Sequence, residues 1–168
     1  KDTGSVALFG DDLQKGFENM TQEDMALPFV RILGQLSPQV TDGDAKYIDG
    51  AKPGMIYNTV TSELFEGKKG IKIIPCYYKK DFPEWSDRGD GPGAPVAVHL
   101  PNSPVIQTGK RDGSKIRLPN GNYLEETASY YVLVETKTGG MTPALITMKS
   151  TQLNVSKKWN SMMKTIQI

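Results

Sequence analysis

Hydrophobic and polar residues alternate along much of the chain from Met55 onward, which is the pattern of half-buried β-strands. The clearest case is the segment 130–135, where Tyr130, Val132 and Val134 would share one strand face. A second apolar run at 144–148 follows Gly139 and Gly140, and a glycine pair between two such runs favours a hairpin. The stretches "MIYNTVT" and "SELFEG" predict another hairpin. We therefore expect a mainly β fold.

Two segments instead follow the period of an α-helix. After Pro28, the residues Phe29, Ile32, Leu33 and Leu36 fall at i, i+3, i+4 and i+7, which predicts a short helix over about 28–37. At the other end, Ser150 or Thr151 would cap an amphipathic helix. Its predicted apolar stripe consists of Val155, Trp159, Met162, Met163 and Ile166.

The segment "IKIIPCYYKKDFPEW", residues 71–85, combines a strand pattern with many aromatic and basic residues. Pro75 cannot donate a ladder hydrogen bond, so it predicts an edge strand or a bulge. Strict alternation would place Lys72, Ile74, Cys76, Tyr78 and Lys80 on one face. Both faces are apolar at the start and become polar and aromatic at the end. We therefore expect the first half in the core and the second half at a groove or rim.

Composition limits the fold and its chemistry. The 168 residues suffice for one domain, which we place at 21–168 behind a flexible acidic arm at 1–20. Seventeen Gly and eleven Pro favour short strands and turns over a helical bundle. One Cys and one His leave no set of ligands for zinc, so no metal or cofactor is expected. No apolar run is long enough to span a membrane.

Charge is unevenly distributed along the chain. Residues 1–50 carry four Lys/Arg against nine Asp/Glu, whereas residues 51–168 carry sixteen against ten. An asymmetry of this kind suggests an electrostatic face on the second part, with an acidic arm that competes for it. An ordinary solvated surface is the alternative, because the excess of six positive charges is small.

The sequence contains no catalytic motif that we recognise. His99 lies in the strand-like "VAVHLP", where a histidine with a satisfied hydrogen bond is expected rather than a general base. Cys76 lies in an apolar strand and is expected to be a buried structural thiol. No phosphate-binding loop, nucleophile elbow or paired metal-ligating histidines occur. We therefore expect that the protein is not an enzyme.

Basic and aromatic residues are interleaved in a way that suits single-stranded nucleic acid. Such a ligand needs cations along its phosphates and aromatic faces on which its bases stack. The segment 71–85 supplies both, and the loops near residues 88 and 110–117 add further cations. The alternative is that the rings cover an open barrel end and the loop charges are merely solvated. The candidate nucleic-acid-binding residues are Lys72, Tyr77, Tyr78, Lys79, Lys80, Phe82, Trp85, Arg88, Lys110, Arg111, Lys115 and Arg117.

Three stretches together resemble bacteriophage-encoded single-stranded DNA-binding proteins: "ALPFVRILGQLSPQV", "GAKPGMIYNTVTSELFEGKKGIKIIPCYYKKDFPEW" and "STQLNVSKKWNSMM". The resemblance implies an OB-fold, a five-stranded Greek-key barrel with an added helix. It also implies coating of single strands during phage DNA replication or recombination, in the cytoplasm of the infected bacterial host. Phage replication or recombination proteins are then the implied partners. Such DNA-binding proteins often recruit them through an acidic C-terminal tail, whereas this sequence ends at "MKTIQI" without one.

Several alternatives remain open at this level. A β-sandwich would show the same strand pattern as an OB barrel. A phage structural or assembly protein, docking through the methionine-rich helix, is the competing function, and a nuclease is the third.

Overall fold

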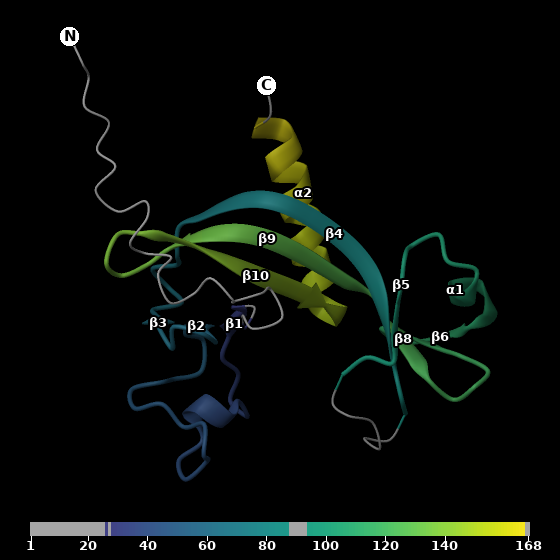
Figure 1. Cartoon of the computed structure of the whole chain (residues 1–168), viewed down its shortest axis with the longest axis horizontal. Coiled ribbons are helices and arrows are strands. Elements are labelled where there is room, and N and C mark those ends of the chain that lie inside the picture. Colours follow the sequence, from purple (N-terminus) through teal and green to yellow (C-terminus); the bar gives the residue numbers. More distant parts are fainter. Residues whose placement is uncertain (1–25, 27, 88–93, 167–168) are drawn as a thin grey trace, which may run out of the picture.

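The computed structural model describes residues 26, 28–87 and 94–166, and it is mainly β, as predicted. Two antiparallel sheets form the body of the molecule (Figure 1). The smaller sheet contains β1 (Val30–Ile32), β2 (Ile56–Asn58) and β3 (Leu64–Phe65) in that order. The hairpin between β2 and β3 is the one predicted from "MIYNTVT" and "SELFEG".

The larger sheet has seven strands in the order β10-β9-β4-β8-β7-β6, with β5 also paired to β4. The predicted hairpin around Gly139 and Gly140 is confirmed as β9 and β10. Across the described residues this order is open, because β10 and β6 lie at opposite ends of it. The strands therefore do not show the closed five-stranded barrel that the resemblance implies. The strands are β4 (Ile73–Trp85), β5 (Ala97–His99), β6 (Lys110–Asp112), β7 (Lys115–Arg117), β8 (Tyr123–Glu125), β9 (Thr127–Glu135) and β10 (Met141–Lys149).

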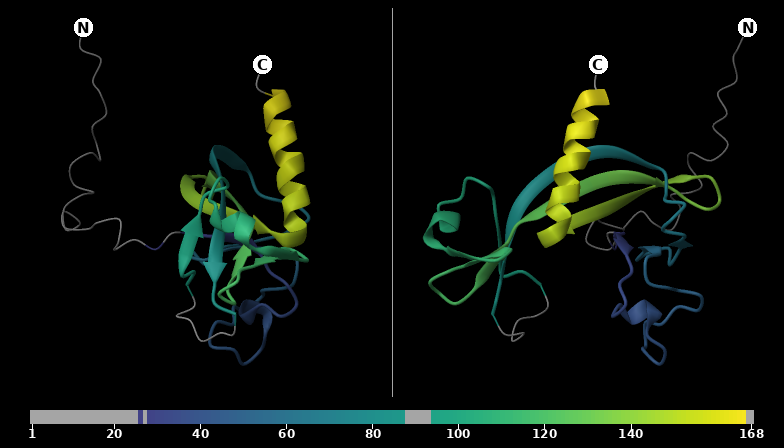
Figure 2. Two further views of the ribbon diagram at one scale, coloured as in Figure 1. Left: turned by 90° about the vertical axis from the view of Figure 1, so that its right-hand side faces the viewer. Right: turned by 180° about the vertical axis from the view of Figure 1, so that it is seen from behind.

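Two apolar clusters lie on the same side of the seven-stranded sheet. The first is built on β9 and β10, and α2 (Leu153–Ile166) lies across it (Figure 2). The second lies at the far end of β4, beneath the short α1 (Val105–Thr108). β4 is the arched strand that connects the two clusters (Figure 1).

The predicted helix over 28–37 is wrong. This segment forms β1, which pairs with β2, followed by a turn and a short 3₁₀ helix at Pro38–Val40. Backbone hydrogen bonds of the extended chain explain the difference, because Leu145 N–H donates to the Pro28 carbonyl at 2.8 Å. The β-branched Val30 and Ile32 also suit a strand better than a helix. Strand pairing with distant parts of the chain thus outweighs a helical pattern that rests on four apolar residues.

The C-terminal helix is confirmed, with Ser150–Gln152 forming a 3₁₀ turn before α2. Its predicted apolar stripe is only partly buried. Trp159 and Met163 pack against the core, whereas Val155, Met162 and Ile166 are exposed. The most buried residue of the helix is Ser156, because the Tyr130 hydroxyl lies 2.6 Å from its Oγ.

The expected burial along residues 71–85 is reversed. In β4 the residues from Ile74 to Tyr78 are exposed, and Phe82 is buried with only 7% of its surface accessible. Pro75 does mark a bulge, since the pairing with β9 shifts between Pro75 and Tyr77. The first half of β4 has β9 on one side only, whereas the second half pairs with both β5 and β8. That second neighbour explains why the aromatic end is the buried end.

Two expectations fall outside the described residues, namely the acidic arm at 1–20 and Arg88. In the part of the chain that the structure covers, no helix is long and apolar enough to cross a membrane.

Candidate nucleic-acid interface

The register of the seven-stranded sheet assigns each side chain to one of its two sides, because residues directly opposite each other on paired strands point the same way. Tyr78 pairs with Tyr130 on the side that holds the apolar clusters, which we call the core side. Tyr77 pairs with Tyr131 on the opposite side, which we call the outer side. This division can be followed from β10 through β4 to β6.

Two tyrosine rings meet on the outer side where β4 and β9 run together. The ring centroids of Tyr77 and Tyr131 are 5.7 Å apart, with the planes tilted by 52°. Tyr77 is 62% exposed and Tyr131 is 38% exposed. Ile74 and Leu133 lie on the same side, because they form the next outer-side pair of β4 and β9. The four side chains, Ile74, Tyr77, Leu133 and Tyr131, form a partly exposed aromatic and aliphatic surface, which we call the tyrosine platform.

A second group of rings lies on the outer side at the far end of β4. Trp85 pairs with Tyr123 of β8, and Tyr123 pairs with Arg117 of β7. The Lys115 ammonium lies 3.7 Å from the centroid of the Tyr123 ring, and the Lys149 ammonium lies 5.1 Å from that of Trp85. Both distances are within the range of cation–π attraction. This end of the outer side therefore combines rings with cations.

Most cations of the outer side are paired with carboxylates of the same chain. The Lys79 ammonium lies 3.0 Å from Asp81, and this hydrogen-bonded partner raises the pKa of Lys79 above its ordinary value. Arg117 contacts two carboxylates, and these raise its pKa as well. The pairs are Lys72 with Glu135 (3.3 Å), Lys79 with Asp81 (3.0 Å), Arg117 with Asp87 (2.7 Å) and Asp112 (3.2 Å), and Lys149 with Glu125 (2.8 Å).

The register brings seven of the twelve candidate residues to the outer side: Lys72, Tyr77, Lys79, Trp85, Lys110, Lys115 and Arg117. Four others lie on the core side. Tyr78 is 5.1 Å from Tyr130 between ring centroids, Phe82 belongs to the second apolar cluster, and Arg111 pairs with the buried Ile116. Lys80 pairs with Glu126 at 2.6 Å on the same side. Arg88 lies outside the described residues.

Three aromatic or basic residues that the structure places on the outer side were not among the candidates: Tyr123, Tyr131 and Lys149. Each lies far in sequence from the segment 71–85 and is brought beside it by strand pairing. Tyr131 belongs to a well-predicted strand, so its alternation with Tyr130 indicated that one of the two tyrosines faces outward. Nothing in the sequence indicates which ring of β4 it meets.

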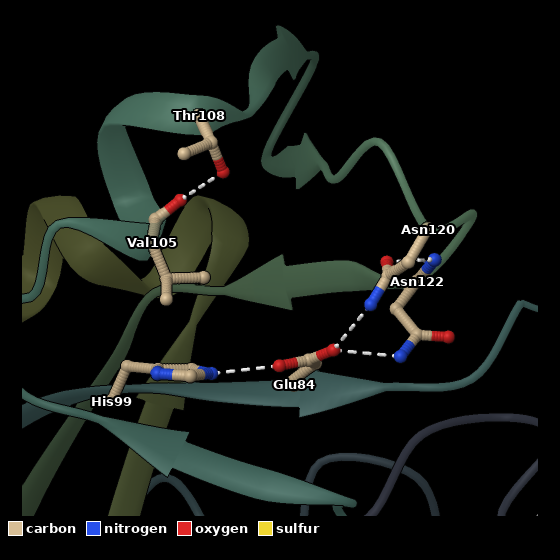
Figure 3. Close-up of polar contacts among 6 residues, drawn as sticks. All are labelled: Glu84, His99, Val105, Thr108, Asn120 and Asn122. Carbon is tan, nitrogen blue, oxygen red and sulfur yellow. Dashed lines mark hydrogen bonds and ion pairs between the residues drawn. The ribbon is translucent and has the colours of Figure 1, made fainter.

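A buried polar cluster centred on Glu84 holds the far end of β4 in place (Figure 3). Its Oε2 lies 2.7 Å from His99 Nε2, and its Oε1 accepts hydrogen bonds from Asn122 at 2.6 Å and Asn120 at 3.1 Å. The amide of Asn122 and the His99 ring hold the pKa of Glu84 below its ordinary value of 4.5, against the effect of burial. His99 thus has the satisfied hydrogen bond expected of it. Because both carboxylate oxygens are engaged, the cluster is suited to joining strands.

An apolar groove of about 650 Å³ lies between the two sheets and α2. Ile56, Ile73 and Ile146 line it, and Trp159 of α2 also contributes. Cys76 is not buried as expected but exposed, at the bulge of β4. Among the described residues, no group of three or more His, Cys, Asp or Glu side chains is placed to hold a metal ion.

Comparison with known proteins identifies the family. The model of the Pam3 phage gp34-like proteins matches residues 1–168. The chain belongs to this family. It is therefore a phage protein. Searches of curated proteins and of solved structures found no match.

Proposed function

We propose that this phage protein binds single-stranded DNA on the outer side of its seven-stranded sheet. The unpaired bases stack on exposed rings, first those of Tyr77 and Tyr131, and the phosphates contact neighbouring lysines and arginines. The single observation behind the proposal is the sorting of side chains by register. The apolar clusters occupy one side of the sheet, whereas rings and cations gather on the other.

The chemistry of the outer side favours a single strand over a duplex. Aromatic stacking requires an accessible base face, which a duplex buries within its own stack, and it tolerates any base. The binding therefore needs no fixed sequence, which suits a protein that coats strands during phage replication or recombination in the cytoplasm of the infected host. We also propose, from the sequence resemblance, that the fold is related to the OB-fold.

The decisive experiment is a fluorescence titration of the protein with oligo-dT, oligo-rU and duplex DNA at several salt concentrations. We expect oligo-dT to bind more tightly than the duplex, with an affinity that falls steeply as salt rises. The comparison with oligo-rU establishes whether DNA or RNA is preferred. Absence of any affinity for oligo-dT at low salt would exclude the proposed function.

A second candidate is a phage assembly protein that docks other proteins, and the apolar groove is the observation that favours it. The groove is continuous with exposed apolar residues, because Ile32 and Val155 line it and remain 66% and 45% exposed. Exposed apolar surface of this kind often marks a protein interface. Detection of the chain in purified virions, together with no affinity for oligo-dT, would favour this function over DNA binding.

A further inference from the structure

Several cations of the proposed site already form ion pairs with carboxylates of the same chain. The Lys72 ammonium lies 3.3 Å from Glu135, next to Leu133 of the tyrosine platform. Lys79 and its partner Asp81 lie at the other end of the platform. At the far end of the sheet, Arg117 contacts both Asp112 and Asp87. A phosphate that approaches any of these cations meets a carboxylate beside it.

Two effects oppose phosphate binding at such a pair. The cation must leave its carboxylate or share its hydrogen bonds with the phosphate. The carboxylate then remains close to a second negative charge, and this repulsion disfavours the complex. Exposed ion pairs are individually weak, so a phosphate can displace them, but several together reduce affinity appreciably.

We propose that Glu135 and Asp112 act as built-in competitors of nucleic-acid phosphate, so that they limit the affinity of the outer side. This inference rests on the proposed function, because it concerns the same site. These carboxylates would affect DNA binding although they do not themselves contact the DNA. The consequence is a protein that holds single strands loosely enough to be displaced.

The test neutralises these carboxylates without changing their shape. Glu135→Gln frees Lys72 on the outer side, and Asp112→Asn removes one of the two carboxylates that contact Arg117, the other being Asp87. Glu126→Gln is the matched control, because it also frees a lysine of β4, Lys80, but on the core side. All four proteins, wild type included, are titrated with oligo-dT over a range of salt, and thermal unfolding confirms that each variant is folded.

We expect Glu135→Gln to raise the affinity by about 1.4-fold to fivefold, the range that corresponds to one exposed ion pair. Asp112→Asn should raise it by less, because Asp87 still contacts Arg117. The salt dependence should become steeper by about 0.7 for each cation that gains a phosphate contact. Glu126→Gln should leave both quantities unchanged.

The outcomes separate the two proposals. If the wild type has no affinity for oligo-dT, the proposed function itself is excluded. If the wild type binds but the two outer-side variants bind equally well, the competitor role is overturned while DNA binding stands. If Glu126→Gln raises the affinity as much as the others, net charge explains the effect and the competitor role is overturned as well.

Discussion

The two halves of β4 differ in their neighbouring strands and in the exposure of their side chains. From Ile73 to Asp81 the strand pairs with β9 alone, and its side chains from Ile74 to Tyr78 are exposed. From Phe82 to Trp85 it pairs with β5 and β8, and its side chains are buried or half-buried. One strand thus presents rings to solvent at one end and contributes the ring of Phe82 to an apolar cluster at the other. The aromatic content of a segment therefore does not by itself locate a binding surface.

The bulge near Pro75 is what aligns the exposed half with its partner. It inserts one extra residue, so that Tyr77, rather than Cys76, comes opposite Tyr131. Without it, strict alternation would place Tyr78 on the side where Ile74 lies. A single residue of register therefore decides which tyrosine meets Tyr131 on the outer side and which one meets Tyr130 on the core side.

The largest difference between the halves should appear in stability. Phe82→Ala removes a buried ring from the second apolar cluster, and we expect it to reduce the free energy of unfolding by about 3–5 kcal/mol. Tyr77→Ala removes an exposed ring and should reduce it by no more than about 1.5 kcal/mol, the value of one aromatic pair. Urea denaturation of both variants measures this. Equal losses would show that the two halves are not distinct.

The Glu84 cluster should make the buried half sensitive to acid. The pKa of Glu84 is lower in the folded protein than in the unfolded chain, so the unfolded chain binds more protons. The stabilisation is therefore complete above about pH 4.5, and it is lost as the pH falls through the lower, folded pKa. Glu84→Gln should reduce the free energy of unfolding at neutral pH by about 1.5–3 kcal/mol, because a charged hydrogen-bond acceptor is lost.

Urea denaturation at pH values from 3 to 7, chosen to bracket the roughly pH 4 titration of an ordinary Glu, checks this prediction. The variant should lose part of the acid dependence shown by the wild type. Glu66→Gln is the control, because Glu66 forms an exposed pair with Lys69 in a turn. If Glu84→Gln and Glu66→Gln behave alike, the cluster does not stabilise this half.

The sequence predicted the features that depend on local pattern. The hairpin of β9 and β10 follows from alternation on both sides of Gly139 and Gly140, and α2 follows from a long helical period. The helix expected after Pro28 does not form. Its pattern rests on only four apolar residues, and the backbone of this segment instead forms hydrogen bonds with β2 and β10. The more residues support a pattern, the harder it is for tertiary contacts to override it.

The candidate site was predicted in composition but not in arrangement. Lys72, Tyr77 and Lys79 share the outer side only because of the bulge, whose effect on register cannot be counted from the sequence. Tyr131 and Lys149 reach the site through pairings across long sequence separations. The ion pairs of Lys72 with Glu135 and of Lys149 with Glu125 also join residues far apart in sequence. Local sequence thus indicated the chemistry, and topology determined where it is displayed.

Substitution in the exposed half of β4, which should affect stability least, should affect the affinity for DNA most. If Tyr77 stacks on a base, Tyr77→Ala should weaken binding to oligo-dT by about 1–3 kcal/mol. Tyr47→Ala is a suitable control, because Tyr47 is also exposed, at 42%, but lies on a loop outside both sheets. Fluorescence anisotropy with labelled oligo-dT gives both affinities. An unchanged affinity for Tyr77→Ala would remove the tyrosine platform from the proposed site.

The finest comparison concerns two adjacent lysines. Lys79 and Lys80 lie side by side in β4 but point to opposite sides of the sheet, and each is paired with a carboxylate, Asp81 or Glu126. Lys79→Ala should lower the salt dependence of oligo-dT binding by about 0.7, the contribution of one phosphate contact to a single strand. Lys80→Ala should leave it unchanged.

Both substitutions remove one positive charge and leave one carboxylate without its lysine, so the pair compares the two sides of the sheet at equal net charge. The affinities of the two variants are measured at four or more salt concentrations and plotted on logarithmic scales, where the slope counts phosphate contacts. A weaker salt dependence for Lys80→Ala than for Lys79→Ala would place the bound single-stranded DNA on the core side of the sheet. That result would contradict the assignment by register on which the proposed interface depends.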